Sequence, residues 1–183
     1  MAVRILGING AVERESRAGR ALRFTLGLLA RHSAHCETFE IGALPIRNGN
    51  SGDDYPATVA AWRAAVEAAD ALVLAVPTLH GAIPGALKNA LDFLDGTMVE
   101  GKPFALIGIS RGDAEPAVSD TARVLRHLGA VAAVPDVVIS RANDHWGDGD
   151  EPANRQVAIA IERVAEGLVR LCALRAEGRL PIP

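Results

Sequence analysis

Residues 10–17 have the types and spacing that could bind an anion. They follow an apolar run and precede a stretch with helical spacing, so they are expected to form a strand-to-helix loop. Free backbone N–H groups and the helix dipole favour a phosphate there. The candidate contacts are Gly10, Ala11, Arg14, Ser16 and Arg17. Ser16 could instead only cap the helix. The loop contains neither the dinucleotide pattern GxGxxG nor the Walker pattern GxxxxGK[ST].

Two further loops follow apolar runs and carry polar residues. Residues 77–84 include His80, the only histidine in a predicted site loop, and residues 110–115 include Ser110, Arg111 and Gly112. Imidazole can move a proton near neutral pH, and a guanidinium can stabilise developing negative charge. A solvated side chain is the alternative for both residues, and the sequence leaves the choice open.

Other polar groups are interpreted as structural. Lys88, Asn89 and Asp92 follow helical spacing beside inward-facing leucines, which favours helix capping and subunit contacts over catalysis. Segment 144–150 is rich in aspartate but matches no calcium-loop template, so a solvated turn is expected. The two cysteines lack CxxC or metal-ligand spacing, which favours reduced thiols. No metal site is predicted.

The elements that must position these loops follow from apolar periodicity. Strands are expected at residues 3–8, 36–41, 70–76, 104–110 and 131–139, and helices at 17–29, 57–69, 84–94, 116–128 and 152–171. Alternating strands and helices imply parallel crossovers with helices on both faces. The prediction is an α/β fold, a three-layer doubly wound domain with five parallel strands in the order 2-1-3-4-5. The ends of strands 1, 3 and 4, and hence the three loops, then meet at the switch point.

Composition agrees with this fold and limits the partners. A chain of 183 residues with 49% hydrophobic residues suits one domain, assigned to residues 1–183. The net charge of −3, without clustered lysine and arginine, argues against nucleic acid. The apolar N-terminal stretch reaches Gly7 too early for a signal-peptide core, and no apolar run approaches the ~18 residues that a membrane helix needs. A cytoplasmic protein without a membrane partner is expected.

The stretch from Pro77 to Leu94 resembles a known family. Its letters PTLHGAIPGALKNALDFL match nearly every position of the pattern P-x-Y-[HN]-G-S-[IY]-[PS]-G-x-L-K-N-x-[IL]-D. That pattern is typical of the NAD(P)H-dependent FMN reductases of the flavodoxin-like superfamily. The first loop is similar to the family's G-S-x-R-x-x-S, and the resemblance covers most of the chain. It implies a flavodoxin-like fold, FMN as cofactor, and NADH or NADPH as co-substrate.

The resemblance also implies which residues bind FMN. They are the five candidates of the first loop, then Pro77, Thr78, Leu79, His80, Gly81 and Ala82, and finally Ser110, Arg111 and Gly112. The chain departs from the family at Ala11 and Glu13, where the family has a hydroxyl residue and an arginine, and at Leu79, where it has tyrosine. Either Arg14 or Arg17 could replace the missing arginine. No protein group is certain to be catalytic because hydride chemistry belongs to the cofactor. His80 and Arg111 are the candidates.

The implied activity is transfer of a hydride from NADH or NADPH to FMN and onward to a small-molecule acceptor. That acceptor could be free flavin, a quinone, an azo compound or a metal oxyanion. Two alternatives stay open: a reductase that binds flavin loosely as a substrate, and a non-catalytic, flavodoxin-like electron-transfer module. The resemblance and the apolar helix at residues 85–94 further lead us to expect a homodimer or a homotetramer.

Overall fold

The computed structural model describes residues 2–49, 55–132, 134–146 and 149–179. Its strands are β1 (Arg4–Asn9), β2 (His35–Phe39), β3 (Ala71–Pro77), β4 (Pro103–Ile109), β5 (Val131–Ala132) and β6 (Val137–Ile139). Its helices are α1 (Arg17–Arg31), α2 (Ala57–Ala68), α3 (Gly85–Leu91), α4 (Gly96–Val99), α5 (Glu115–His127) and α6 (Arg155–Ala176), with short 3-10 turns η1 (Ile41–Ala43) and η2 (Ala142–Asp144).

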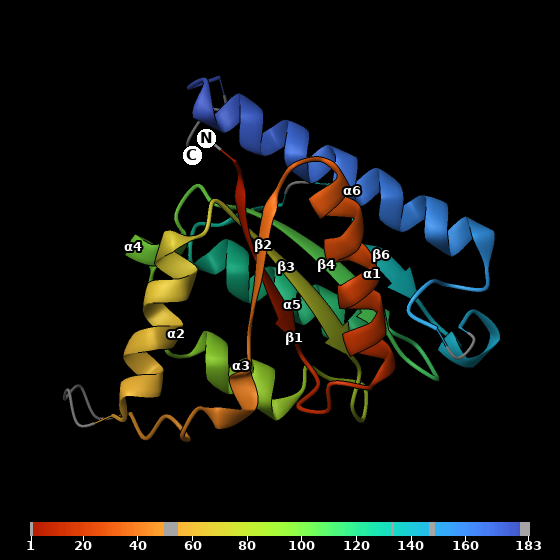
Figure 1. The fold of residues 1–183 in the computed structure, drawn as a ribbon. Coiled ribbons are helices and arrows are strands. Elements are labelled where there is room, and N and C mark those ends of the chain that lie inside the picture. Colours follow the sequence, from red (N-terminus) through yellow and green to blue (C-terminus); the bar gives the residue numbers. More distant parts are fainter. Residues whose placement is uncertain (1, 50–54, 133, 147–148, 180–183) are drawn as a thin grey trace.

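The strands form one parallel sheet in the order β2-β1-β3-β4-β5, and β6 also pairs with β4 (Figure 1). This confirms the predicted α/β class and strand order. The most apolar strand, β3, lies at the centre with Ala71–Val76 buried, whereas the more polar β2 lies at one edge. The predicted fifth strand comprises β5 and β6, with Pro135 between them, because proline cannot donate to a ladder.

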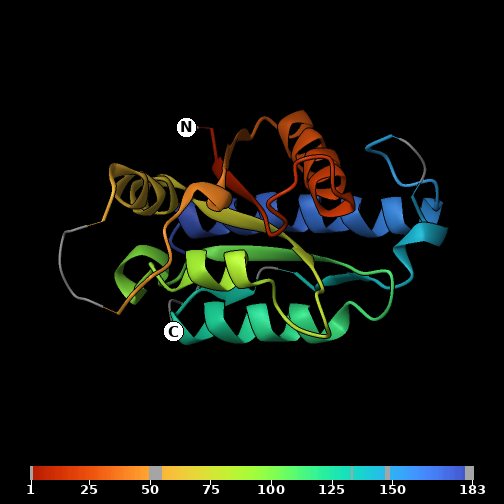
Figure 2. The ribbon, with the colours of Figure 1, turned by 90° about the horizontal axis from the view of Figure 1, so that it is seen from below.

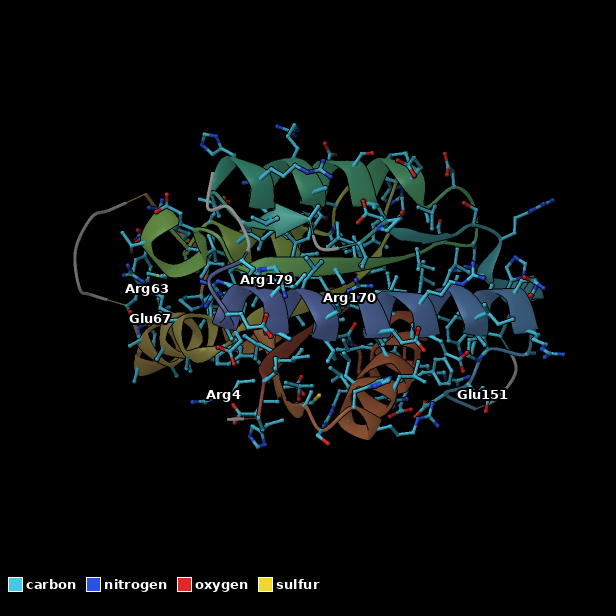
Figure 3. All side chains as sticks on the ribbon, turned by 90° about the horizontal axis from the view of Figure 1, so that it is seen from above. Arg4, Arg63, Glu67, Glu151, Arg170 and Arg179 are labelled. Atoms are coloured by element: carbon cyan, nitrogen blue, oxygen red, sulfur yellow. The ribbon has the colours of Figure 1, made fainter. Side chains whose placement is uncertain are left out.

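Helices cover both faces of the sheet (Figure 2). Helices α1 and α6 pack on one face, in a cluster that includes Leu22, Leu29, Val73, Ile161 and Leu168. Helices α2, α3 and α5 pack on the other, in a cluster that includes Trp62, Leu72, Leu87, Leu91 and Leu125. Figure 3 labels Arg63 and Glu67 on α2 and Arg170 on α6, which are all exposed on the outside of these layers. Each helix thus has one apolar and one polar face, as its periodicity predicts.

Several boundaries differ from the predictions, including the end of β2, the end of α3 and the start of α6. Strand β2 ends at Phe39, because Ile41 opens η1 instead of continuing the strand. Helix α3 ends at Leu91, so the buried Leu94 lies beyond it. Helix α6 begins after Pro152, because the Asn154 side chain caps it by accepting a hydrogen bond from the Gln156 N–H at 2.9 Å. None of the described helices is long and apolar enough to span a membrane.

At the N-terminal edge of the sheet, the Lys102 side chain is buried. Its ammonium donates hydrogen bonds to the carbonyl oxygens of Val66 at 2.6 Å, Glu67 at 3.1 Å and Ala69 at 2.6 Å. These carbonyls lie at the C-terminal end of α2, where helix carbonyls lack their usual partners, and among the described residues only the Val66 carbonyl also accepts a backbone hydrogen bond, from the Ala69 N–H at 3.3 Å. Burial, together with the positive charge of Arg175, lowers the pKa of Lys102 to about 8.

Candidate functional site

The loops after β1, β3 and β4 meet at the carboxyl edge of the sheet (Figure 1). The Gly10 N–H donates to the Ala75 carbonyl at 2.8 Å, which ties the first loop to β3. The Thr78 N–H donates to the Ile109 carbonyl at 3.2 Å, and its hydroxyl lies 3.4 Å from the Ala114 carbonyl. Residues 10–17, 77–82 and 110–112 are therefore neighbours, as the strand order predicted.

Side chains fold the first loop onto the start of α1. Asn9 donates from Nδ2 to the Glu13 carbonyl and accepts at Oδ1 from the Ala11 N–H, both at 3.1 Å. Ser16 caps α1, because its Oγ accepts from the Gly19 N–H at 3.1 Å. The N–H groups of residues 12–15, 17 and 18 form no hydrogen bond to any described residue. The loop thus offers free donors at the positive end of a helix, which suits a phosphate.

Two residues that sequence reasoning missed shape this loop. Asn9 supplies the two hydrogen bonds that close it. Gly19 allows it to lie against α1, since a Cβ at this position would stand 2.0 Å from the Arg14 carbonyl oxygen. A glycine in the first turn of a helix weakens the helix by ~1 kcal/mol relative to alanine. That penalty is the signal that could have marked Gly19 as a position of close approach.

The arginines near the first loop have different partners. The Arg14 Nε lies 3.3 Å from a carboxylate oxygen of Glu40. Arg23 contacts Asp150 at 2.8 Å and Glu15 at 3.1 Å, and its hydrogen bond holds the pKa of the Asp150 carboxyl below its ordinary value. Arg17 is exposed and forms no ion pair with any described residue. Of these three, Arg17 is the arginine with no competing carboxylate.

The loop after β3 closes in a two-residue hairpin. The Leu79 N–H donates to the Ala82 carbonyl at 3.1 Å, and the Ala82 N–H donates back at 3.0 Å. His80 and Gly81 between them have φ values of 51° and 76°, the left-handed backbone of a type I′ turn. Histidine tolerates this region better than most residues, which gives the His-Gly pair a backbone reason. The turn leaves Leu79 57% exposed and His80 exposed at the carboxyl edge.

The loop after β4 is fixed by its own side chains and by the segment after β6. The Ser110 Oγ accepts from the Gly112 N–H at 3.1 Å, and the Ser110 carbonyl accepts from the Ala142 N–H at 2.8 Å. The N–H groups of Arg111 and Asp113 form no hydrogen bond to any described residue. Arg111 is exposed. This loop therefore presents two backbone donors and one guanidinium at the site.

The polar residues of α3 lie beside the loops and have structural partners. Lys88 Nζ lies 2.5 Å from Asp92 Oδ1, an ion pair along the helix. Asn89 donates to the Pro45 carbonyl and accepts from the Arg47 N–H, both at 2.9 Å. Asn89 thus holds the segment after η1 to α3 instead of capping the helix. In the sequence, Asn89 is one amide among positions with helical spacing. Nothing in that pattern indicates its partners, Pro45 and Arg47, which are distant in the chain.

The aspartate-rich segment 144–150 is only partly described, since residues 147 and 148 lie outside the described residues. Trp146 is buried against α6, and its Nε1 donates to the Asp150 carbonyl at 3.0 Å. Asp150 in turn pairs with Arg23 on α1. The described part is therefore a packed connection and not only a solvated turn. Among the described residues, no group of three or more histidine, cysteine, aspartate or glutamate side chains is placed to hold a metal ion.

Comparison with known proteins identifies the family. A family model described as NADPH-dependent FMN reductase matches residues 3–144, which include all three loops. The chain belongs to the NADPH-dependent FMN reductase family. Membership confirms the expected class of enzyme, an NAD(P)H-dependent oxidoreductase with FMN as its cofactor.

Several members and solved structures resemble this FMN reductase. A 2-hydroxy-1,4-benzoquinone reductase from a Burkholderia species is 30% identical over 155 residues, 82% of this chain and 81% of that protein. An FMN-dependent NADPH-azoreductase from Staphylococcus haemolyticus is 29% identical over 146 residues, 75% of this chain and 77% of that one. The flavoenzyme FerB, an NAD(P)H:(acceptor) oxidoreductase from Paracoccus denitrificans, superimposes with a TM-score of 0.79 at 24% identity, covering 94% and 98% of the two chains. The superposition shows a shared fold.

Proposed function

We propose that this FMN reductase binds FMN across the three loops and passes electrons from NAD(P)H to a quinone. The free backbone donors at the start of α1 are the observation that carries the binding site. The quinone is chosen over free flavin, azo compounds and metal oxyanions because the Burkholderia relative, at 30% identity over most of both chains, reduces a benzoquinone.

The first loop would hold the phosphate. Gly10 and Ala11 already donate their N–H groups to Ala75 and Asn9, so they shape the loop. Residues 12–15, with the N–H groups that open α1, supply the donors. Ser16 uses an oxygen lone pair for its cap and keeps its O–H proton to donate. Either arginine could add a charge, and Arg17 is the better candidate because Arg14 pairs with Glu40.

The other two loops would hold the ring. Pro77 and Thr78 lead into the hairpin of Leu79, His80, Gly81 and Ala82, whose exposed leucine offers an apolar surface to an aromatic ring. Ser110 and Gly112 hold the third loop so that the Arg111 N–H and guanidinium can donate to the pyrimidine edge. Bound FMN supplies the hydride chemistry. Donors already aimed at that edge stabilise negative charge without rearranging, which lowers the barrier to reduction.

Two tests separate this function from its alternatives. The purified enzyme should retain yellow flavin after dialysis and oxidise NAD(P)H faster when benzoquinone is added. Loss of flavin on dialysis, with activity restored only by excess free FMN, would show a reductase that uses flavin as a substrate. Bound flavin that NAD(P)H does not reduce would indicate an electron-transfer module, which family membership argues against.

We further propose that the enzyme acts as a homodimer or homotetramer of single-domain chains. Ile46 is 85% exposed and lies on the segment that Asn89 holds to α3. Leu79 is a second exposed apolar residue at the site edge. A second copy covering these residues would also shield the ring from water. Light scattering should show two or four chains at assay concentrations, and a fully active monomer would contradict this. The cytoplasmic location stays a prediction.

A further inference from the structure

Arg23 on α1, which the proposed function does not use, holds the first loop against the helix. It lies seven residues after the cap Ser16, about two helical turns, and helical side chains lean toward the N-terminus of their helix. Its guanidinium reaches back to the loop, where Nη1 donates to the Arg14 carbonyl at 2.8 Å and Nη2 donates to a Glu15 carboxylate oxygen at 3.1 Å. One side chain thus binds both a main-chain group and a side chain of the loop.

The Arg23 guanidinium is itself fixed by Asp150. Its Nε lies 3.1 Å and 3.0 Å from the two carboxylate oxygens, and its Nη2 lies 2.8 Å from Oδ1. The Asp150 carbonyl accepts a hydrogen bond from Trp146, whose ring is buried against α6. A planar guanidinium that is held by both oxygens of a carboxylate has little freedom to turn. Arg23 is therefore a fixed support for the loop, although its side chain is only half-buried.

The contact with the Arg14 carbonyl determines the direction of a backbone donor. The described peptide bonds are trans, so the carbonyl of one residue and the N–H of the next point in opposite directions. The Arg14 carbonyl points to α1, where it accepts from Arg23 and lies where a Cβ on Gly19 would stand 2.0 Å from it. The Glu15 N–H consequently points away from Arg23, and it is one of the free donors of the loop.

The Glu13 carbonyl is fixed in a similar way. It accepts hydrogen bonds from Asn9 Nδ2 at 3.1 Å and from the Ser16 N–H at 3.3 Å, so the Arg14 N–H points to the opposite side of that peptide. Two successive carbonyls are thus bound by the protein. The N–H groups of Arg14 and Glu15 remain free, and successive free N–H groups in a turn suit an anion.

The Glu15 carboxylate would oppose a phosphate at these donors, because like charges repel. Arg23 binds that carboxylate at 3.1 Å. The hydrogen bond from Arg23 and the positive charge of Arg20 both lower the pKa of the Asp150 carboxyl, so two positive charges lie near the two carboxylates. The loop can therefore contain a glutamate beside its free donors.

We propose that Arg23 is a positioning residue for the FMN phosphate: it directs the Glu15 N–H toward the phosphate and keeps the Glu15 carboxylate away from it. The proposal rests on the function proposed above, in which the first loop binds that phosphate. Arg23 contacts the loop and not the cofactor. Through Asp150, the aspartate-rich connection before α6 also supports the phosphate site.

Arg23→Met tests the proposal, because methionine keeps an unbranched apolar stem and removes every donor. The apoprotein is titrated with FMN and with riboflavin, which lacks the phosphate, and flavin fluorescence reports binding. The affinity for FMN should fall about tenfold, through loss of charge-assisted contacts that shape the phosphate site. The affinity for riboflavin should stay at the wild-type value, whereas a general loss of structure would weaken both.

Arg63→Met is the matched control. Arg63 forms a similar half-exposed ion pair, with Asp95 at 3.0 Å. Figure 3 shows Arg63 at the opposite end of the molecule from Glu151, which is the neighbour of Asp150 in the sequence. Both flavin affinities of this variant should equal those of the wild type.

Two further variants separate the two parts of the role. Arg23→Lys keeps the charge but lacks the planar fork, so it should weaken FMN binding less than Arg23→Met, and it decides the proposal if circular dichroism shows that Arg23→Met does not fold. Adding Glu15→Gln to Arg23→Met should restore part of the FMN affinity, because the unpaired carboxylate is removed. No restoration would contradict the role assigned to the Glu15 carboxylate.

Equal losses of FMN and riboflavin affinity in Arg23→Met, or no loss of either, would overturn the proposal. If the wild-type protein binds FMN no better than riboflavin, the phosphate site of the proposed function fails, and the role of Arg23 fails with it. If Arg17→Ala weakens FMN binding and Arg23→Met does not, the phosphate site stands and only the role of Arg23 is rejected.

Discussion

At the N-terminal edge of the sheet, the Lys102 ammonium donates to three carbonyls at the end of α2, whereas at the carboxyl edge the N–H groups of residues 12–15 have no acceptor among the described residues. Both regions place a helix end beside parallel strands. At the first, a side chain of the protein satisfies the helix, which stabilises the fold. At the second, the helix start keeps free donors, which we propose bind the FMN phosphate. The contrast is between one helix end that the protein's own side chain satisfies and one that keeps free donors beside the proposed phosphate site.

The largest effect is expected at the satisfied edge. Lys102→Met should lower the free energy of unfolding by about 2–4 kcal/mol, because it strips the buried carbonyls at the end of α2 of their donor. Urea unfolding followed by circular dichroism measures this loss. The affinity of the folded fraction for FMN should not change, because Lys102 lies at the opposite edge from the loops. If Lys102→Met were as stable as the wild type but bound FMN weakly, Lys102 would act at the binding site, and the contrast between the two edges would be wrong.

At the ligand edge, Arg17→Ala should weaken FMN binding tenfold or more through loss of a charge-assisted contact to the phosphate. Ser16→Ala should weaken it as well, and should also destabilise α1 by about 1 kcal/mol because the cap is lost. Fluorescence titration of the apoprotein with FMN gives both affinities. Arg31→Ala, at the far end of α1, is the control. If neither variant alters the titration, this loop does not bind the phosphate.

The pH dependence of stability sharpens the same contrast. Lys102 has a folded-state pKa of about 8 against an ordinary 10.5, so between these values the unfolded chain binds more protons than the folded one. The contribution of this group to the free energy of unfolding therefore rises with pH across that window. Urea titrations at pH 7.5 and pH 10 should show that Lys102→Met costs more stability at the higher pH. An equal cost at both pH values would contradict the lowered pKa.

The smallest effect is expected at the third loop. Arg111→Ala should lower the midpoint potential of bound FMN and slow its reduction by NAD(P)H in stopped flow, because one of three candidate donors at the pyrimidine edge is lost. The backbone donors remain, so FMN should stay bound. Wild-type values for both quantities would assign any stabilisation to the N–H groups of Arg111 and Asp113 alone.

Much of the fold follows from local pattern. Apolar runs at Val3–Ile8 and at Asp70–Val76 predict β1 and β3, because strands buried on both faces must be continuously apolar. Pro135 predicts the interruption between β5 and β6. The boundaries of β2, α3 and α6 were wrong, because a cap such as Asn154 and a turn such as η1 depend on which groups the neighbouring chain leaves unpaired.

The sequence by itself determined the layered parallel fold, the meeting of three loops at one edge and, through the motif from Pro77 to Asp92, the family. These are encoded in periodicity and in contiguous residues. Only the tertiary structure decided the partners that are distant in sequence: Arg14 with Glu40, Asn89 with the segment after η1, and Lys102 with the end of α2. A side chain's partner depends on which groups folding brings within ~3 Å of it, and residue type and spacing do not specify that distance.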